Sequence, residues 1–118
     1  SKNEAMQLYK SAVEKEKLTA REDTYKLREK STNLSSNLFE YKLLKETLTS
    51  AQLHLEYIIK ANRQGIKDLT ELIDAQEKVI TIENEIIDIS MQAIVNIIDL
   101  EFLNKKADLD LLKLLRIN

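Results

Sequence analysis

A single glycine and the complete absence of proline leave this 118-residue chain very few folds. Glycine and proline are the residues that most often end helices and form turns. The glycine lies close to the middle of the chain, in the segment Asn62-Arg63-Gln64-Gly65-Ile66-Lys67-Asp68. Because little else interrupts a helix on either side, the sequence predicts one very long helix, a tight reversal and a second long helix.

Helix-ending and helix-starting signals follow one another around this glycine. Lys60 and Arg63 would lie in the last turn of the first helix, where cations offset the negative end of the helix dipole. Gly65 suits the left-handed position just after a helix, which disfavours residues with a Cβ atom. Asp68 can cap the second helix, with Glu71 three residues further on, as in a capping box.

These signals set the expected boundaries. We expect a first helix at about 4–63, a turn at 64–67 and a second helix at about 68–103. We also expect an irregularity at 104–106, followed by a further helical stretch at about 107–116. The predicted fold class is all-α, with the whole chain forming one long antiparallel coiled-coil hairpin.

One row of the second helix repeats at alternating steps of three and four residues. It reads Leu72, Ala75, Val79, Ile82, Ile86, Ile89, Ala93, Asn96, Leu100, Leu103 and Ala107. A sustained repeat of 3.5 residues is typical of left-handed coiled-coil packing. The members that we expect to form the packing seam are Leu72, Val79, Ile82, Ile86, Ile89 and Leu100.

A second apolar row lies beside the seam, at steps of seven residues. Its members are Ile73, Ile80, Ile87 and Ile94. Two adjacent rows make an apolar arc too wide for one partner helix. We therefore expect this helix to have neighbours on two sides, as in a bundle, a sheet of helices or a barrel of helices.

The first helix has the same repeat only in its second half. The expected row there is Leu34, Leu38, Tyr41, Leu44, Leu48, Ala51, Leu55 and Ile58. The stretch 14–33 is mostly charged. It is either solvated or packed loosely against elements outside this chain.

Charge is distributed unevenly along the chain. Residues 1–64 contain 12 Lys and Arg against 9 Asp and Glu, a net +3, whereas residues 65–118 contain 6 against 11, a net −5. This complementarity favours packing of the two halves against each other or against neighbouring copies. Neither half is basic enough to indicate nucleic-acid binding.

Catalysis and metal binding have little support. His54 is the single histidine, with no second ligand at helical spacing, and cysteine is absent. Glu71 and Asp74 could pair as acid and base, but no nucleophile or glycine loop accompanies them. We expect no enzyme activity, no metal site and no cofactor. No apolar run is long enough for a membrane-spanning helix.

A polar row also follows the second helix, away from the seam. Its members are Lys67, Glu71, Asp74, Lys78, Thr81, Glu85, Asp88 and Gln92. One interpretation is a solvated outer face. The other is the lining of a water-filled channel, in which rings of carboxylates favour cations. Periodicity does not separate the two, because water lies on that face in both.

The segment from Asn62 to Gln76 resembles the signature of the TolC family of outer-membrane efflux channels. The glycine of that signature is Gly65, and Leu72-Ile73-Asp74-Ala75-Gln76 matches its closing run. The stretch Thr49-Ser50-Ala51-Gln52-Leu53 is similar to the small-residue stretch before the tip. The resemblance extends from about residue 5 to about residue 100.

The resemblance implies a periplasmic hairpin of a larger trimeric channel, whose helices form a tunnel and whose strands, missing here, contact the outer membrane. It places Lys67, Glu71 and Asp74 at the channel aperture. It implies docking of a periplasmic adaptor protein, which links the channel to an inner-membrane transporter. The docking residues would be Arg63, Gln64, Gly65, Ile66 and Leu69. The channel would serve drug efflux or type I protein export and open when the hairpins splay.

Two departures from the family pattern bear on the tip and on the end of the second helix. Asn62 replaces an aromatic residue often found three positions before the glycine, and Asn104 follows Leu103 where the family tends to have glycine. The alternative function is a structural coiled-coil hairpin, such as an adaptor or scaffold segment. Adaptor tips usually have an arginine, a leucine and a serine at fixed spacing, which is not found around residue 65.

Overall fold

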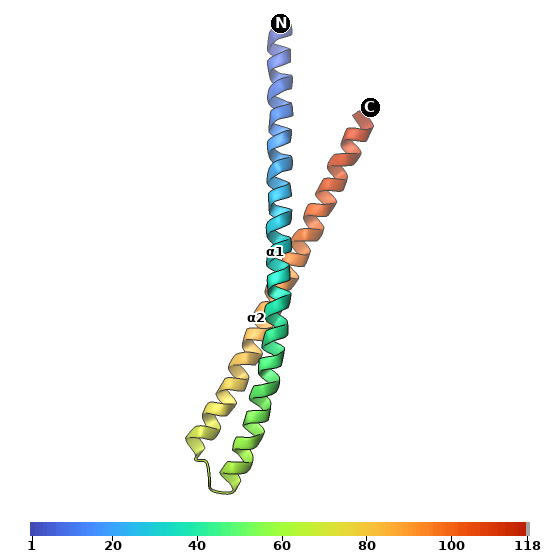
Figure 1. Ribbon diagram of the computed structural model, residues 1–118. Helices are drawn as coiled ribbons and strands as arrows, with labels where there is room; N and C mark the ends of the chain where they lie inside the picture. Colours follow the sequence, from blue (N-terminus) through green and yellow to red (C-terminus); the bar gives the residue numbers. More distant parts are fainter. Residues whose placement is uncertain (118) are drawn as a thin grey trace. The chain divides into compact units, whose positions relative to one another are not determined.

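The computed structural model describes residues 1–117 and shows two long helices joined by a short connection (Figure 1). Helix α1 comprises Lys2–Arg63 and helix α2 comprises Leu69–Ile117. No strand occurs among the described residues. The chain is an all-α helical hairpin, which confirms the predicted fold class.

The predicted irregularity at 104–106 is wrong, because α2 continues through these residues to Ile117. Asparagine and lysine cost a helix interior only a few tenths of a kcal/mol relative to alanine, and only glycine or proline would interrupt it strongly. Two residues of this stretch also form ion pairs. Lys105 Nζ lies 3.4 Å from Glu101 Oε1 one turn earlier, and Lys106 Nζ lies 3.0 Å from Asp23 Oδ2 of α1.

The end of α1 has the hydrogen-bond pattern of a Schellman motif. The Ile66 amide donates to the Ala61 carbonyl over 2.9 Å, and the Gly65 amide donates to the Asn62 carbonyl over 3.0 Å. Gly65 has φ of 75°, in the left-handed region expected for a C′ residue. The prediction of a left-handed glycine at the bend is therefore confirmed.

The start of α2 is capped as the sequence indicated. The Glu71 amide donates to Asp68 Oδ1 over 2.9 Å, which satisfies one of the free amides in the first turn. The Asn62 side chain closes the connection from the other side, because its Nδ2 donates to the Lys67 carbonyl over 3.0 Å. The departure at Asn62 from the family pattern thus has a structural role in this chain.

The chain divides into two compact units, and each contains a segment of both helices. We call Leu34–Val95 the hairpin unit, and Ser1–Asn33 with Asn96–Asn118 the terminal unit. In the hairpin unit, Ala51 of α1 packs with Val79 and Ile82 of α2. Side chains packed around this cluster are Leu44, Leu48, Leu55 and Ile86.

The burial pattern of α1 in the hairpin unit corrects one member of the predicted row. Leu38 is 55% exposed, whereas Asn37 is only 7% exposed. A strict alternation of three- and four-residue steps leads from Leu34 through Asn37 to Tyr41, and it excludes Leu38. An apolar side chain alone does not bring Leu38 into the seam, because the coiled-coil geometry selects the position and accepts the polar Asn37 there.

The terminal unit also has antiparallel packing between α1 and α2, but through charged side chains. Lys30 Nζ lies 2.9 Å from Asp99 Oδ2, and Lys106 Nζ lies 3.0 Å from Asp23 Oδ2. Leu27, Leu100 and Leu103 are half-buried between these pairs. The C-terminal part of stretch 14–33 therefore packs on this chain's own α2. Neither solvation nor packing against elements outside this chain, the two expectations for the stretch, included this contact.

Candidate functional site

The hairpin tip exposes a small apolar and basic surface. Ile66 is 67% exposed and Leu69 is 64% exposed. Arg63 and Gln64 are also exposed, as is the backbone at Gly65. The structure thus brings all five predicted docking residues to one accessible turn. Two bulky apolar side chains beside a guanidinium group can bind a partner helix by burying surface at a few anchor residues.

The three predicted aperture residues lie at the start of α2 and just before it. Lys67 is half-buried, and its Nζ lies 3.7 Å from Glu71 Oε1. Both side chains remain partly open to solvent, so the pair contributes little to stability. Asp74 is exposed and forms no ion pair with a described residue. A free carboxylate and a loosely paired one therefore face solvent next to the tip.

The polar row of α2 continues from these residues along the hairpin unit. Its members beyond Lys67, from Glu71 to Gln92, are all exposed. The row includes the acidic residues Glu71, Asp74, Glu85 and Asp88, against one cation at Lys78. The face is therefore hydrated and net negative, which is compatible with either interpretation of the row.

The predicted packing seam of α2 faces α1. Val79, Ile82 and Ile89 are each less than one-tenth exposed, and Leu72, Ile86 and Leu100 are half-buried. Asn96 occupies the same row and is 8% exposed. None of the buried side-chain nitrogen and oxygen atoms in the described part of the chain lacks a hydrogen-bond partner.

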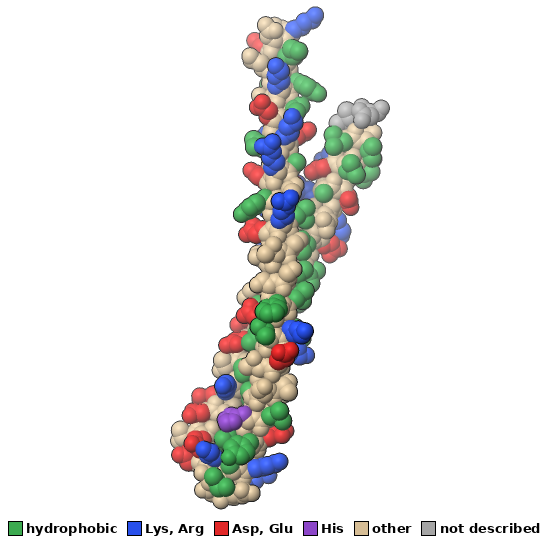
Figure 2. Space-filling view, viewed as in Figure 1, with side chains coloured by type: hydrophobic (Ala, Val, Ile, Leu, Met, Phe, Trp, Pro, Cys, Tyr) green, Lys and Arg blue, Asp and Glu red, His purple; other side chains and the backbone are tan. Residues whose placement is uncertain are grey.

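The second apolar row of α2 is not covered by α1. Ile73 is 43% exposed, Ile80 and Ile87 are each 56% exposed, and Ile94 is 54% exposed. Met91, 62% exposed, continues the same face one turn after Ile87. Figure 2 shows apolar side chains open to solvent along the face in view. In the hairpin unit α2 thus has three faces: a buried seam, a polar row and an open apolar row.

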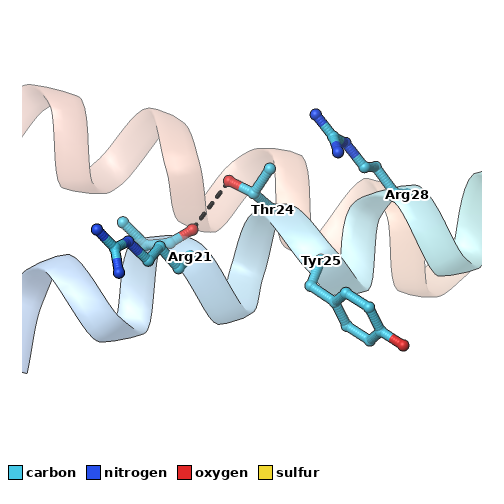
Figure 3. A pocket seen from close by; sticks show the side chains of 5 residues that line it. Arg21, Thr24, Tyr25 and Arg28 are labelled. Carbon is cyan, nitrogen blue, oxygen red and sulfur yellow. Dashed lines mark hydrogen bonds between the residues drawn. The ribbon is translucent and has the colours of Figure 1, made fainter.

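The terminal unit contains a hollow that sequence reasoning did not find. It has a volume of about 410 Å³ and is lined by Ala20, Arg21, Thr24, Tyr25 and Arg28 (Figure 3). The Thr24 hydroxyl donates to the Ala20 carbonyl over 2.9 Å, so it is satisfied locally. The seven-residue step from Arg21 to Arg28 is the only sequence signal of this surface, because it places both guanidinium groups on one face.

No part of the described chain has the residues of a metal centre, since groups of three or more potential ligands are absent from it. Neither α1 nor α2, as far as the structure describes them, has a stretch apolar enough to cross a bilayer. Comparisons of the chain with protein-family models, with curated proteins and with solved structures found no significant match.

Proposed function

We propose that this hairpin is a wall element of a TolC-like trimeric channel, in which several hairpins lie side by side around a water-filled tunnel. The observation that carries the proposal is the open apolar row of α2, Ile73, Ile80, Ile87 and Ile94. A helix that already buries one seam inside its hairpin needs this second row only if another helix covers it.

The polar row supports the same proposal. In a closed ring of hairpins, one face of each α2 must contact water in the tunnel while the seam and the apolar row contact neighbouring helices. Glu71 and Asp74 would then form rings of carboxylates near the tip, which favour cations at a constriction. Lys67 would modulate this field through its pair with Glu71.

The tip would serve as the docking surface for a periplasmic adaptor protein, and the adaptor would couple the channel to an inner-membrane transporter. Ile66 and Leu69 are the anchors, with Arg63 and Gln64 at their rim. The proposed location is the periplasmic part of an outer-membrane protein, with drug efflux or type I protein export as its task.

Conductance of the full-length channel tests the aperture directly. Glu71→Gln with Asp74→Asn should reduce cation preference and block by multivalent cations. The double substitution Glu85→Gln with Asp88→Asn is the matched control, since it removes two carboxylates of the same row further from the tip. Unchanged conductance and block in the first variant would remove Glu71 and Asp74 from the aperture.

A structural coiled-coil hairpin, such as an adaptor or scaffold segment, is the second candidate. One observation favours it: residues of this single chain bury the seam around Val79 and Ile82 without any second chain. The reading frame that encodes this chain discriminates the two. A TolC-like parent encodes another hairpin of similar length and two pairs of strands, whereas an adaptor parent encodes lipoyl-like and β-barrel segments.

A further inference from the structure

Two hollows follow one another along α1 in the terminal unit. The first, described above, is lined by Ala20, Arg21, Thr24, Tyr25 and Arg28 (Figure 3). The second has a volume of about 280 Å³ and is lined by Glu14, Lys17, Leu18 and Arg21. Apart from Ala20, a shift of seven residues turns one set into the other. The helix thus presents the same four-residue opening twice, about 10.5 Å apart along its axis.

This arrangement is the one that a helix offers to the side chains of a facing helix in a coiled coil. Each knob of the partner enters a hole formed by four residues, and holes for equivalent knobs repeat every seven residues. On a helix surface, positions i, i+3, i+4 and i+7 are neighbours and enclose such a hole. Both hollows have this spacing, with i at residue 14 and at residue 21. The surface is therefore shaped to receive another helix.

Helix α2 of the same chain does not fill these hollows. In the terminal unit it pairs with Asp23 and Lys30 of α1, and Leu27 is half-buried between them. Tyr25 lies midway between Asp23 and Leu27 in the sequence, so its side chain points away from α2. Tyr25 is 70% exposed and Leu18, its counterpart in the other hollow, is 58% exposed.

The row that begins at Leu18 continues along α1 at multiples of seven residues. Phe39 and Leu53, in the hairpin unit, are 67% and 62% exposed. The two intermediate positions have the polar residues Thr32 and Glu46. From Leu18 to Leu53 the row runs 35 residues, or about 52 Å of helix. A second long helix is the partner that matches a row of this length and spacing.

The charges around the hollows indicate the chemistry of that partner. Lys17, Arg21 and Arg28 are exposed, and none of them forms an ion pair with a described residue. No carboxylate lies three or four residues from Arg21 or Arg28, where a helix could neutralise them. Glu14 is the one acidic residue in the two linings. A helix that fills both hollows is therefore stabilised by carboxylates beside its knobs.

We infer that this surface of α1 binds a helix of the other hairpin of a TolC-like parent, with a knob residue every seven positions and Asp or Glu beside it. The inference rests on the proposed channel and adds the partner of α1. In that trimer the two different hairpins of each protomer alternate around the ring, so the helix beside α1 comes from the other hairpin. The open row of α2 in a second copy is too short, because it spans only 21 residues, from Ile73 to Ile94.

Photo-crosslinking in the purified full-length channel identifies this helix. The photoreactive p-benzoylphenylalanine replaces Tyr25, an aromatic side chain that lines the first hollow, and mass spectrometry identifies the cross-linked peptides. The expected peptide lies outside these 118 residues, in another long helix of the same polypeptide, with carboxylates at seven-residue spacing. The same group at Lys26, which lines neither hollow, is the control and should not give this cross-link. Cross-links to a second copy of this hairpin, or none, would overturn the inference.

Charge reversal tests the acidic chemistry of the partner. Arg21→Glu with Arg28→Glu should raise the rate at which labelled protomers exchange between trimers by at least about threefold at low salt, because carboxylates then face carboxylates. Reversal of the carboxylates on the cross-linked helix should restore the wild-type rate. Lys15→Glu with Lys26→Glu makes the same charge change at exposed residues outside the hollows and is the control. Equal rates for the two double variants would rule out an acidic partner.

The two proposals fail in different ways. If the full-length protein does not form trimers, or its reading frame encodes no second hairpin, the channel proposal fails and the contact fails with it. If trimers form and the photoreactive group at position 25 reaches only a second copy of this hairpin, or no helix at all, the contact is wrong and the channel proposal stands without it.

Discussion

The hairpin unit and the terminal unit use the same two helices and a similar spacing of contact residues, but different chemistry. Ala51, Val79 and Ile82 are buried in the hairpin unit. Lys30 and Asp99 form a half-exposed ion pair in the terminal unit. Apolar burial contributes about 25 cal/mol per Å², whereas partly exposed ion pairs contribute about 1 kcal/mol or less. The spacing of contact residues therefore determines which faces of the two helices pair, and the residue types at those positions determine how stable each unit is.

The ends of the terminal unit illustrate the consequence. Residues 1–12 and 107–116 are all exposed, including Leu8, which is 73% exposed, and Leu115, which is 65% exposed. Few packed apolar contacts mean a low free energy of local opening. The hairpin unit is thus the more stable part of an isolated chain, and the terminal unit should open first.

The largest expected effect comes from breaking the apolar seam. Ile82→Ala removes a side chain that is 5% exposed and should lower the free energy of unfolding by about 2–4 kcal/mol. Ile80→Ala is the control, since it makes the same chemical change on the open apolar row. Equal losses in urea unfolding of dilute protein would show that the seam is no more buried than the open row.

A second variant gives the terminal unit the chemistry of the hairpin unit. Asp23→Leu combined with Lys106→Leu replaces a partly buried ion pair by apolar side chains and should raise the free energy of unfolding by about 1–2 kcal/mol. Hydrogen exchange of amides near residues 20–30 should slow in parallel. A loss of stability would mean that the two helices are held together here by the opposite charges and not by the placement of these two positions at the helix interface.

The reversal itself should be sensitive to the backbone conformation at Gly65. No atom would lie within 4 Å of an added Cβ there, so Gly65→Ala is opposed only by its φ of 75°. The expected cost is about 1 kcal/mol, because alanine disfavours the left-handed region. Gln64→Ala is the control and should leave the thermal unfolding midpoint unchanged. If Gly65→Ala also leaves the midpoint unchanged, the backbone strain of the turn lies at another residue.

The smallest effect is expected for the ion pair of the terminal unit. A double-mutant cycle with Lys30→Ala and Asp99→Ala should give a coupling free energy of about 0.2–1 kcal/mol at low salt. The coupling should shrink at high salt, because both side chains are partly exposed. A coupling that is several times larger and independent of salt would contradict the contrast between the units.

The sequence predicted the reversal and the seam because each depends on local rules. Only one glycine was present to adopt a positive φ, and the row from Leu72 to Leu103 is almost entirely apolar. The pairing of Asp23 with Lys106 and of Lys30 with Asp99 was missed, because a search for apolar residues stops where the seam becomes charged. Extending the same spacing from Leu34 back to Leu27 and Asp23 would have found it.

The exposed rows of α2 show a different limit. Periodicity placed Ile80 and Ile87 on one face and Asp74 on another, but it gave no means of distinguishing a face in water from a face against a neighbouring helix. A single chain leaves both exposed. The row from Ile73 to Ile94 can be covered only by helices outside this chain. Its neighbour is therefore part of the proposed function and does not follow from the sequence of this chain.

Sedimentation equilibrium of the 118-residue chain, with Ile80→Gln and Ile87→Gln introduced together, tests the second contact face of α2 most directly. The wild-type chain should associate as concentration rises. The variant should remain monomeric at the same concentrations and keep the helical content and unfolding midpoint of the dilute wild-type chain. Equal association of wild type and variant, or a monomeric wild type throughout, would contradict the proposal that this face packs against a neighbouring helix.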